Sequence, residues 1–232
     1  MCKIICKYSK TGYLKYISHL DVLRFIQRSV KRAGINAKYS EGFNPHMKTS
    51  FGFPLSLGTE SIGEYFELEL NENMDLELFV KKMNSVMPNE MQIMKADYSK
   101  DSESLMKRCE YAEYLINIES SIDENELNEY FQEMLTEGVI FNRQKKNKKN
   151  KLVDREINTK EMIHFIEAEK AKDDKIKVMA VFKTQETGSM KVEELIKLII
   201  GKGYAIDYYT IMKIDALDKE MKPILWEQLE ER

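Results

Sequence analysis

The chain is poor in cysteine and has no cysteine spacing typical of a disulfide or zinc framework. Only Cys2, Cys6 and Cys109 occur among 232 residues, and no two of them form a CxxC pair. This pattern favours buried thiols over a metal or redox role. HExxH, GxxxxGK[ST] and GxGxxG are also missing. The sequence therefore predicts no metal, no nucleotide site and no other cofactor.

Long apolar runs are absent as well. No stretch approaches the roughly 18 apolar residues expected of a membrane-spanning helix. The first residues, Met1–Lys7, lack the apolar region of a signal peptide. We therefore expect a protein of the cytoplasm that has no membrane partner.

The chain has little net charge, but its charges are unevenly distributed. The formal net charge is -3. Residues 1–59 contain ten Lys/Arg against two Asp/Glu, and the remainder contains 26 against 37. Such asymmetry favours contact between the first quarter of the chain and a polyanion. The alternative is a small domain whose basic face pairs with the acidic remainder.

The first hundred residues alternate between strand and helix patterns. Residues 2–8 alternate as a strand does, and residues 13–17 resume extended structure after a turn, which predicts a hairpin. Ser18 is the expected N-cap of a helix that ends at Gly34. A second helix is expected from Asp75. Further strands are predicted at 37–40, 48–53, 63–70 and 91–96, which completes a ferredoxin-like βαββαβ order.

The same order recurs after a polar linker at 97–107. Strands are predicted at 112–119, 139–141, 163–168, 175–182 and 209–214, with a turn at 173–174 and helices from Asp123 and around 195–199. We therefore predict an α+β protein of tandem ferredoxin-like domains with antiparallel sheets. The predicted limits are 1–98 for the N-terminal domain, 108–217 for the C-terminal domain and 218–232 for a tail helix.

A row of basic residues marks the outer face of the first helix. Arg24 and Arg28, with Lys31 and Arg32, recur at helical spacing opposite the apolar stripe. Phosphate oxygens are natural partners for such a row. Asp21 is the only acid on the helix, so intrahelical ion pairs cannot neutralise the row. The alternative is a solvated helix face.

The loop that follows carries the segment GFNPH at residues 42–46. Phe43 could stack on a base, although inward packing is the favoured interpretation. Asn44 and His46 could read a base or a sugar, and Lys48 could contact phosphate. The loop is therefore a second candidate for contact with nucleic acid.

Two histidines leave a catalytic alternative open. His19 lies in the first turn of the helix, where backbone N–H groups favour anions. With His46 it could form a general acid–base pair for metal-free RNA cleavage. The favoured interpretation of His19 is a hydrogen-bonding residue at the helix start.

A densely basic segment at 143–151 is predicted to be a solvated loop. As an arm that orders on nucleic acid, it would use Lys145, Lys146, Lys148 and Lys149, together with the later Arg155. The alternative is a solubilising insertion.

Four motifs together resemble the bacterial radical-SAM-linked protein family. They are GxLxYISHLDxxR (12–24), KRAG (31–34), YSEGFNPH (39–46) and PLSLGTES (54–61), and 153–155 resembles a further family pattern. Ser29 stands where the pattern usually has Ala, and Met47 where it usually has Pro. The resemblance implies a domain of unknown function encoded beside, or fused to, radical SAM enzymes with cobalamin-binding regions. The paired ferredoxin-like order is more distantly similar to CRISPR repeat-processing nucleases.

These observations lead to one hypothesis and two alternatives. The hypothesis is an RNA-binding accessory protein that presents a structured RNA to a separate radical SAM enzyme. The first alternative is a metal-independent endoribonuclease that uses His19 and His46. The second is a protein-only adaptor that docks on a radical SAM partner.

Overall fold

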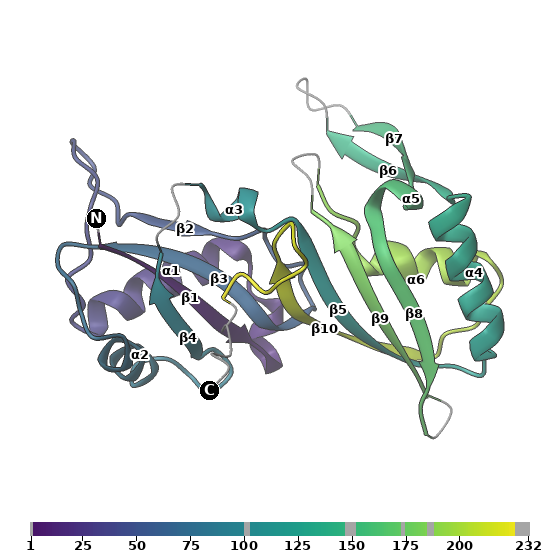
Figure 1. Ribbon diagram of the computed structural model, residues 1–232, viewed down its shortest axis with the longest axis horizontal. Coiled ribbons are helices and arrows are strands. Elements are labelled where there is room, and N and C mark those ends of the chain that lie inside the picture. The colour runs from purple at the N-terminus through teal and green to yellow at the C-terminus, as the bar shows by residue number, and fades with distance from the viewer. Residues whose placement is uncertain (1, 100–102, 147–151, 173–174, 185–187, 226–232) are drawn as a thin grey trace. The chain divides into compact units, whose positions relative to one another are not determined.

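The structure, a computed structural model, describes residues 2–99, 103–146, 152–172, 175–184 and 188–225 (Figure 1). It divides into two compact units, one of residues 1–110 and 212–232 and the other of residues 111–211. Both mix helices with mostly antiparallel strands, which confirms the predicted combination of helices and antiparallel sheet. No described helix combines the length and the apolar character needed to cross a membrane.

The described residues of the first unit hold eight elements and the end of a ninth. They are β1 (Cys2–Lys10), the 3₁₀ helix η1 (Gly12–Tyr16), α1 (His19–Arg32), β2 (Thr49–Phe51), β3 (Glu60–Leu70), α2 (Leu76–Asn84), β4 (Ile93–Tyr98), α3 (Leu105–Arg108) and the last residues of β10 (Tyr208–Leu217). In the sheet, β1 lies between β4 and β3 and is antiparallel to both. β2 pairs antiparallel with β3, and the end of β10 pairs parallel with β3 at Met212 and Lys213.

Both faces of this sheet are covered. Cys6 and Phe66 belong to a core with α1 and α2, whereas Ile5 and Tyr65 belong to a second core with α3 and the segment after β10. The period of two along β1 and β3 explains the division, because successive side chains point to opposite faces.

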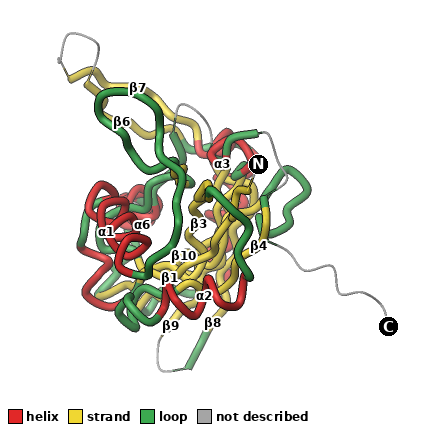
Figure 2. Tube along the Cα trace, turned by 90° about the vertical axis from the view of Figure 1, so that its left-hand side faces the viewer, coloured by secondary structure: helices red, strands yellow, loops and turns green. Residues whose placement is uncertain are grey.

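The second unit repeats the alternation of strands and helices. Its elements are β5 (Tyr111–Glu119), α4 (Glu124–Thr136), β6 (Ile140–Lys146), β7 (Leu152–Asn158), α5 (Thr159–Met162), β8 (Ile163–Lys170), β9 (Lys175–Lys183), α6 (Val192–Gly201) and the start of β10. β9 lies between β5 and β8, and β10 neighbours β5 on its other side. Leu127 and Phe131 of α4 and Leu195 and Ile199 of α6 pack on this sheet. β6 and β7 form a separate hairpin that projects from the unit (Figures 1 and 2).

The predicted helix starts are confirmed. The side chain of Ser18 accepts a hydrogen bond from the backbone N–H of Asp21. Asp75 and Asp123 cap α2 and α4 in the same way. Side-chain oxygens at these positions satisfy backbone donors that the first helical turn leaves unpaired.

The hairpin predicted within residues 2–17 is wrong. Residues 12–16 form η1, with Leu14 N–H donating to the carbonyl of Thr11. The reason is that β3 and β4 already occupy both edges of β1, so a strand at 13–17 would have no edge to join. Residues 37–40 likewise form no full strand, but only isolated bridges at Ala37 and Tyr39.

The loop predicted for 143–151 is wrong over its first four residues, which continue β6 and pair with β7. Residues 147–151 and the turn expected at 173–174 lie outside the described residues. Residues 226–232 of the predicted tail helix do too, and its described part, residues 218–225, turns and pairs through a bridge between Leu217 and Pro223. The helix therefore does not begin at 218. The predicted domain limits stay a prediction.

Candidate nucleic-acid interface

The basic row lies on the solvent side of α1, as its spacing predicts. Val22 and Ile26 are buried on the inner side of this helix. Arg24, Arg28 and Lys31 are exposed on the outer side. Residues three or four apart in a helix are neighbours on its surface, so these three side chains form one stripe.

The charge of this stripe is only weakly compensated. Nη1 of Arg24 lies 3.6 Å from Oδ1 of Asp21, and both side chains are more than half exposed. Such exposed pairs contribute little and exchange readily with other anions. In the part of the chain that the structure describes, Arg28 and Lys31 form no ion pair with an acid. Nζ of Lys31 lies 5.7 Å from the centroid of the Tyr39 ring.

Arg32 has a different role from the other three. Its Nη2 donates to the carbonyl of Val86 at 2.8 Å and to Oγ of Ser29 at 3.2 Å. Its guanidinium lies over the Phe25 ring. Arg32 therefore joins the end of α1 to the segment after α2, and less of its hydrogen-bonding capacity is available to a ligand.

Residues 40–46, called the Phe43 loop below, are closed at their base. Ser40 N–H donates to the carbonyl of His46 at 2.8 Å, and His46 N–H donates to Oγ of Ser40 at 3.1 Å. Gly42 has φ +118°, a left-handed value that favours glycine. Phe43 at the tip is fully exposed. The favoured inward packing of Phe43 is therefore wrong, because the closed base holds the tip of the loop away from the core.

The polar residues predicted in and after this loop are exposed or half-buried. Asn44 and His46 are exposed. Nδ1 of His46 lies 2.8 Å from Oγ of Ser40, which leaves Nε2 for a ligand. Nζ of Lys48 lies 3.7 Å from Oε2 of Glu69. His46 and Lys48 line an open groove of about 300 Å³ beside β2 and β3.

His19 and His46 have different surroundings. His19 is half-buried, and its ring meets Phe51 edge-on at 5.7 Å. Burial lowers the pKa of His19 below its usual 6.5, Glu64 raises it and Lys10 lowers it further. His46 contacts Ser40 instead. These contacts do not favour a catalytic pair, and the acid–base alternative stays a prediction.

The basic residues predicted in the second unit have mixed outcomes. Arg143 donates from Nη2 and Nε to Glu194 at 2.6 and 2.8 Å, so it binds the first turn of α6. Arg155 is exposed on β7. Of Lys145 and Lys146 only the backbone is described, as part of β6. Lys148 and Lys149 lie outside the described residues, and binding by this segment stays a prediction.

Two motifs that are far apart in sequence come together around η1. The N–H of Gly12 donates to Oε1 of Glu60 at 2.8 Å, and the N–H of Gly58 donates to the carbonyl of Lys15 at 3.0 Å. Two aromatic side chains of η1 remain on the surface beside these hydrogen bonds. Tyr13 is 90% exposed and Tyr16 is 63% exposed. The strand predicted at 13–17 gave no indication of this surface, because a 3₁₀ helix presents the two tyrosines differently.

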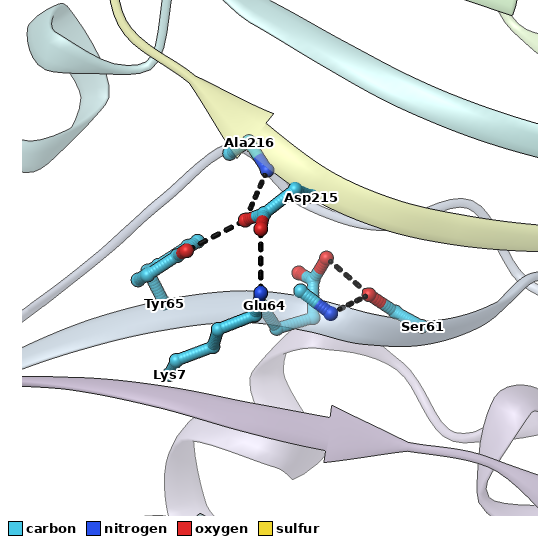
Figure 3. Close-up of polar contacts among 7 residues, drawn as sticks. Lys7, Ser61, Glu64, Tyr65, Asp215 and Ala216 are labelled. Carbon is cyan, nitrogen blue, oxygen red and sulfur yellow. Dashed lines mark hydrogen bonds and ion pairs between the residues drawn. The ribbon is translucent and has the colours of Figure 1, made fainter. Parts of the chain in front are cut away.

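A buried polar network joins β10 to β3 and β1 in the first unit (Figure 3). Asp215 accepts from Nζ of Lys7 at 2.5 Å, from Oη of Tyr65 at 2.6 Å and from the N–H of Ala216 at 2.9 Å. Burial, followed by the charge of Asp215, raises the pKa of Tyr65. The network was not predicted, and its available signal in the sequence is the presence of charged residues inside alternating apolar strands.

A second set of contacts lies beside this network. Glu64 accepts from Nζ of Lys213 at 2.7 Å and from Oγ of Ser61 at 3.0 Å. A side chain at Gly63 would place its Cβ 2.3 Å from the carbonyl oxygen of Ile214. Gly63 therefore permits the close approach of β10 to β3. Within the described residues, no three His, Cys, Asp or Glu side chains are arranged to hold a metal ion.

Several solved structures resemble the chain over 92% of its length. The crystal structure of a Cbf5-Nop10-Gar1 complex gives a TM-score of 0.50 at 11% identity over 48% of that chain. An H/ACA RNP bound to a substrate RNA containing 2'-deoxyuridine gives 0.49 at 12% over 47%. An archaeal box H/ACA sRNP Nop10-Cbf5 complex gives 0.44 at 10% over 48%. The chain thus spans about half the length of the chains it matches, and the first likeness indicates a shared fold.

No curated protein matches this chain in sequence. A family model does match, over residues 3–192, and this range includes α1, the Phe43 loop and the contact around η1. The chain therefore belongs to the family described as "Uncharacterized protein conserved in bacteria (DUF2344)".

Proposed function

We propose that this chain is an RNA-binding accessory protein that presents a structured RNA to a separate radical SAM enzyme. One observation carries the RNA-binding part: Arg24, Arg28 and Lys31 form an exposed stripe with little compensation by acids. Phosphate groups are favourable partners for such a stripe, because binding releases the counterions that the nucleic acid holds. The partner enzyme is inferred from the resemblance of the four motifs to the radical-SAM-linked family.

Each unit is proposed to be a ferredoxin-like domain. The order β4-β1-β3 with β2 on β3 in the first unit, and β10-β5-β9-β8 in the second, supports this assignment. In the first unit α3 and the segment after β10 cover the sheet face opposite α1. RNA is therefore proposed to bind along α1 and not across that face. The likeness to the Cbf5-Nop10-Gar1 structure concerns the fold, and the proposed RNA contact does not depend on it.

The test is a titration of structured RNA at several salt concentrations. We expect log K to fall linearly with log salt, with a slope of roughly 0.9 for each phosphate neutralised on duplex RNA regions. Replacing Arg24→Ala together with Arg28→Ala should weaken binding and reduce this slope by about 2. Fluorescence anisotropy of a labelled hairpin measures both quantities.

A matched control removes the same charge elsewhere. Lys170 and Lys177 are exposed on β8 and β9, and their double replacement by Ala should leave the slope nearly unchanged. Equal losses in both double variants would indicate nonspecific attraction. Absence of RNA binding, with retained copurification of the radical SAM enzyme, would favour the protein-only adaptor.

A further inference from the structure

We propose that the RNA segment held along α1 is single-stranded, with unpaired bases stacked on aromatic side chains at both ends of the helix. This inference rests on the proposed RNA binding and specifies the kind of RNA. Its basis is the position of Tyr16 before the first turn of α1 and of Tyr39 and Phe43 after the last. The basic stripe lies between these aromatic groups.

The N-terminal end of the stripe is aromatic and apolar. Tyr16 is the last residue of η1, and Leu20, 60% exposed, lies in the first turn of α1. Leu20 precedes Arg24 by four residues, so it continues the line that Arg24 and Arg28 form. Nζ of Lys15 lies 5.5 Å from the centroid of the Tyr16 ring. A cation beside an exposed aromatic ring suits a nucleotide, because the ring stacks on the base and the cation attracts the phosphate.

The C-terminal end presents the Phe43 loop. Lys31 reaches the ring of Tyr39, and Tyr39 bridges to Met47 at the base of this loop. Two hydrogen bonds close the loop, one from Ser40 N–H to the carbonyl of His46 and one from His46 N–H to Oγ of Ser40, and Phe43 at its tip is fully exposed. A fully exposed phenylalanine gains most by covering its faces with another aromatic group. His46 adds a donor or acceptor at Nε2 for the stacked nucleotide.

The length of α1 sets the distance between the two aromatic ends of the basic stripe. The 14 residues of α1 span about 21 Å at 1.5 Å per residue. Bases in a duplex are already stacked and paired, so their faces cannot meet Tyr16 or Phe43. Unpaired bases can do so, and such stacking tolerates different sequences because every base has two faces.

The test compares one RNA strand of about 12 nucleotides, within the site sizes of single-strand binders, with the duplex formed on its complement. The strand carries 2-aminopurine near each end, and its fluorescence decreases when the base stacks. We expect the protein to bind the single strand more tightly than the duplex and to quench the fluorescence. Phe43→Ala and Tyr16→Ala should each lower single-strand affinity by about tenfold, since one stacked base typically contributes that much.

Two controls separate stacking from loss of fold or charge. Phe165 is an exposed phenylalanine on β8 of the second unit, and Phe165→Ala should leave affinity and quenching unchanged. Circular dichroism should show the same helix content in every variant. Phe43→Leu keeps an apolar tip without an aromatic face and should behave like Phe43→Ala.

The outcomes distinguish this inference from the proposed function. Salt-sensitive binding that prefers the duplex and is unaffected by Phe43→Ala would overturn the single-strand inference while RNA binding stands. Failure to bind either RNA would overturn both. Loss of radical SAM enzyme copurification in Phe43→Ala and Tyr16→Ala, with RNA binding unchanged, would assign these aromatic groups to a protein partner and overturn the inference.

Discussion

At the scale of single residues, the surroundings of His19 affect how the stability of the protein depends on pH. It begins α1, meets Phe51 edge-on and is influenced by Glu64 and Lys10. Its pKa in the folded state is below the usual 6.5, with burial as the largest cause. Folding therefore opposes protonation of this ring.

This leads to a prediction about pH. As pH falls below about 6.5, the unfolded chain takes up a proton on His19 before the folded chain does. His19 thus lowers the stability of the protein over the window from the unfolded pKa down to the folded pKa, and its effect is absent at higher pH. Urea unfolding at about pH 7.5 and about pH 5.5 should show a smaller loss of stability in His19→Gln than in the original protein.

The comparison between the two proteins isolates the contribution of His19. Glu64 and Lys10 are present in both proteins, so their contributions largely cancel in the difference. His46 is exposed, and the His46→Gln variant, which makes the same substitution at the protein surface, is the matched control. An unchanged pH dependence in His19→Gln would contradict the argument.

At the scale of elements, α1 has one exposed basic side and one apolar side that anchors it. Val22, Ile26 and Val30 pack into the core of the first unit. Ser18 starts the helix, since its Oγ accepts from Asp21 N–H at 3.2 Å and donates to Oδ2 of Asp21 at 2.6 Å. The orientation of the proposed RNA-binding stripe depends on this start and on the packing.

Ser18→Ala is therefore expected to lower the free energy of unfolding by about 1 kcal/mol, the usual cost of losing an N-cap. Urea unfolding followed by circular dichroism measures the change. Ser104, the N-cap residue of α3, provides the control because its side chain makes no capping hydrogen bond. Ser104→Ala should have a much smaller effect, and equal effects would show that the cap of α1 is not the cause.

At the scale of the whole molecule, the first unit is built from both ends of the chain. Residues 212–217 return to lie beside β3, and the buried Asp215 binds Lys7 of β1 and Tyr65 of β3 (Figure 3). The close approach at Gly63 makes room for this return. The hydrogen bonds that these buried side chains make with Asp215 hold the strands in one register.

Asp215→Ala should lower the free energy of unfolding of the first unit by about 3–5 kcal/mol, because it leaves a mostly buried Lys7 ammonium without its partner. Thermal unfolding and amide hydrogen exchange in β1 and β3 would measure this loss. Glu220 and Lys222 form an exposed ion pair in the same unit. Glu220→Ala should change stability far less than Asp215→Ala does, because solvent screens an exposed pair, and a similar loss in both variants would contradict the special role of Asp215.

The sequence by itself determined the elements with strong local signals. Alternation in residues 2–8, the caps at Ser18, Asp75 and Asp123, and the stripe of Arg24 and Arg28 all follow from neighbours a few residues apart. Such signals are local because the helix and strand periods relate residues along one element. The mixed helix and strand content and the exposed basic face were therefore predictable.

Only the tertiary structure decided the rest. The short apolar run at 13–17 is predicted to be extended, yet residues 12–16 form η1 because both edges of β1 are occupied. Phe43 is exposed because Ser40 and His46 close its loop, and no periodicity encodes such a closure. Asp215 binds Lys7, which lies 208 residues away in the chain. Strand pairing and packing bring such distant residues together, and they leave no pattern among neighbouring residues of the sequence.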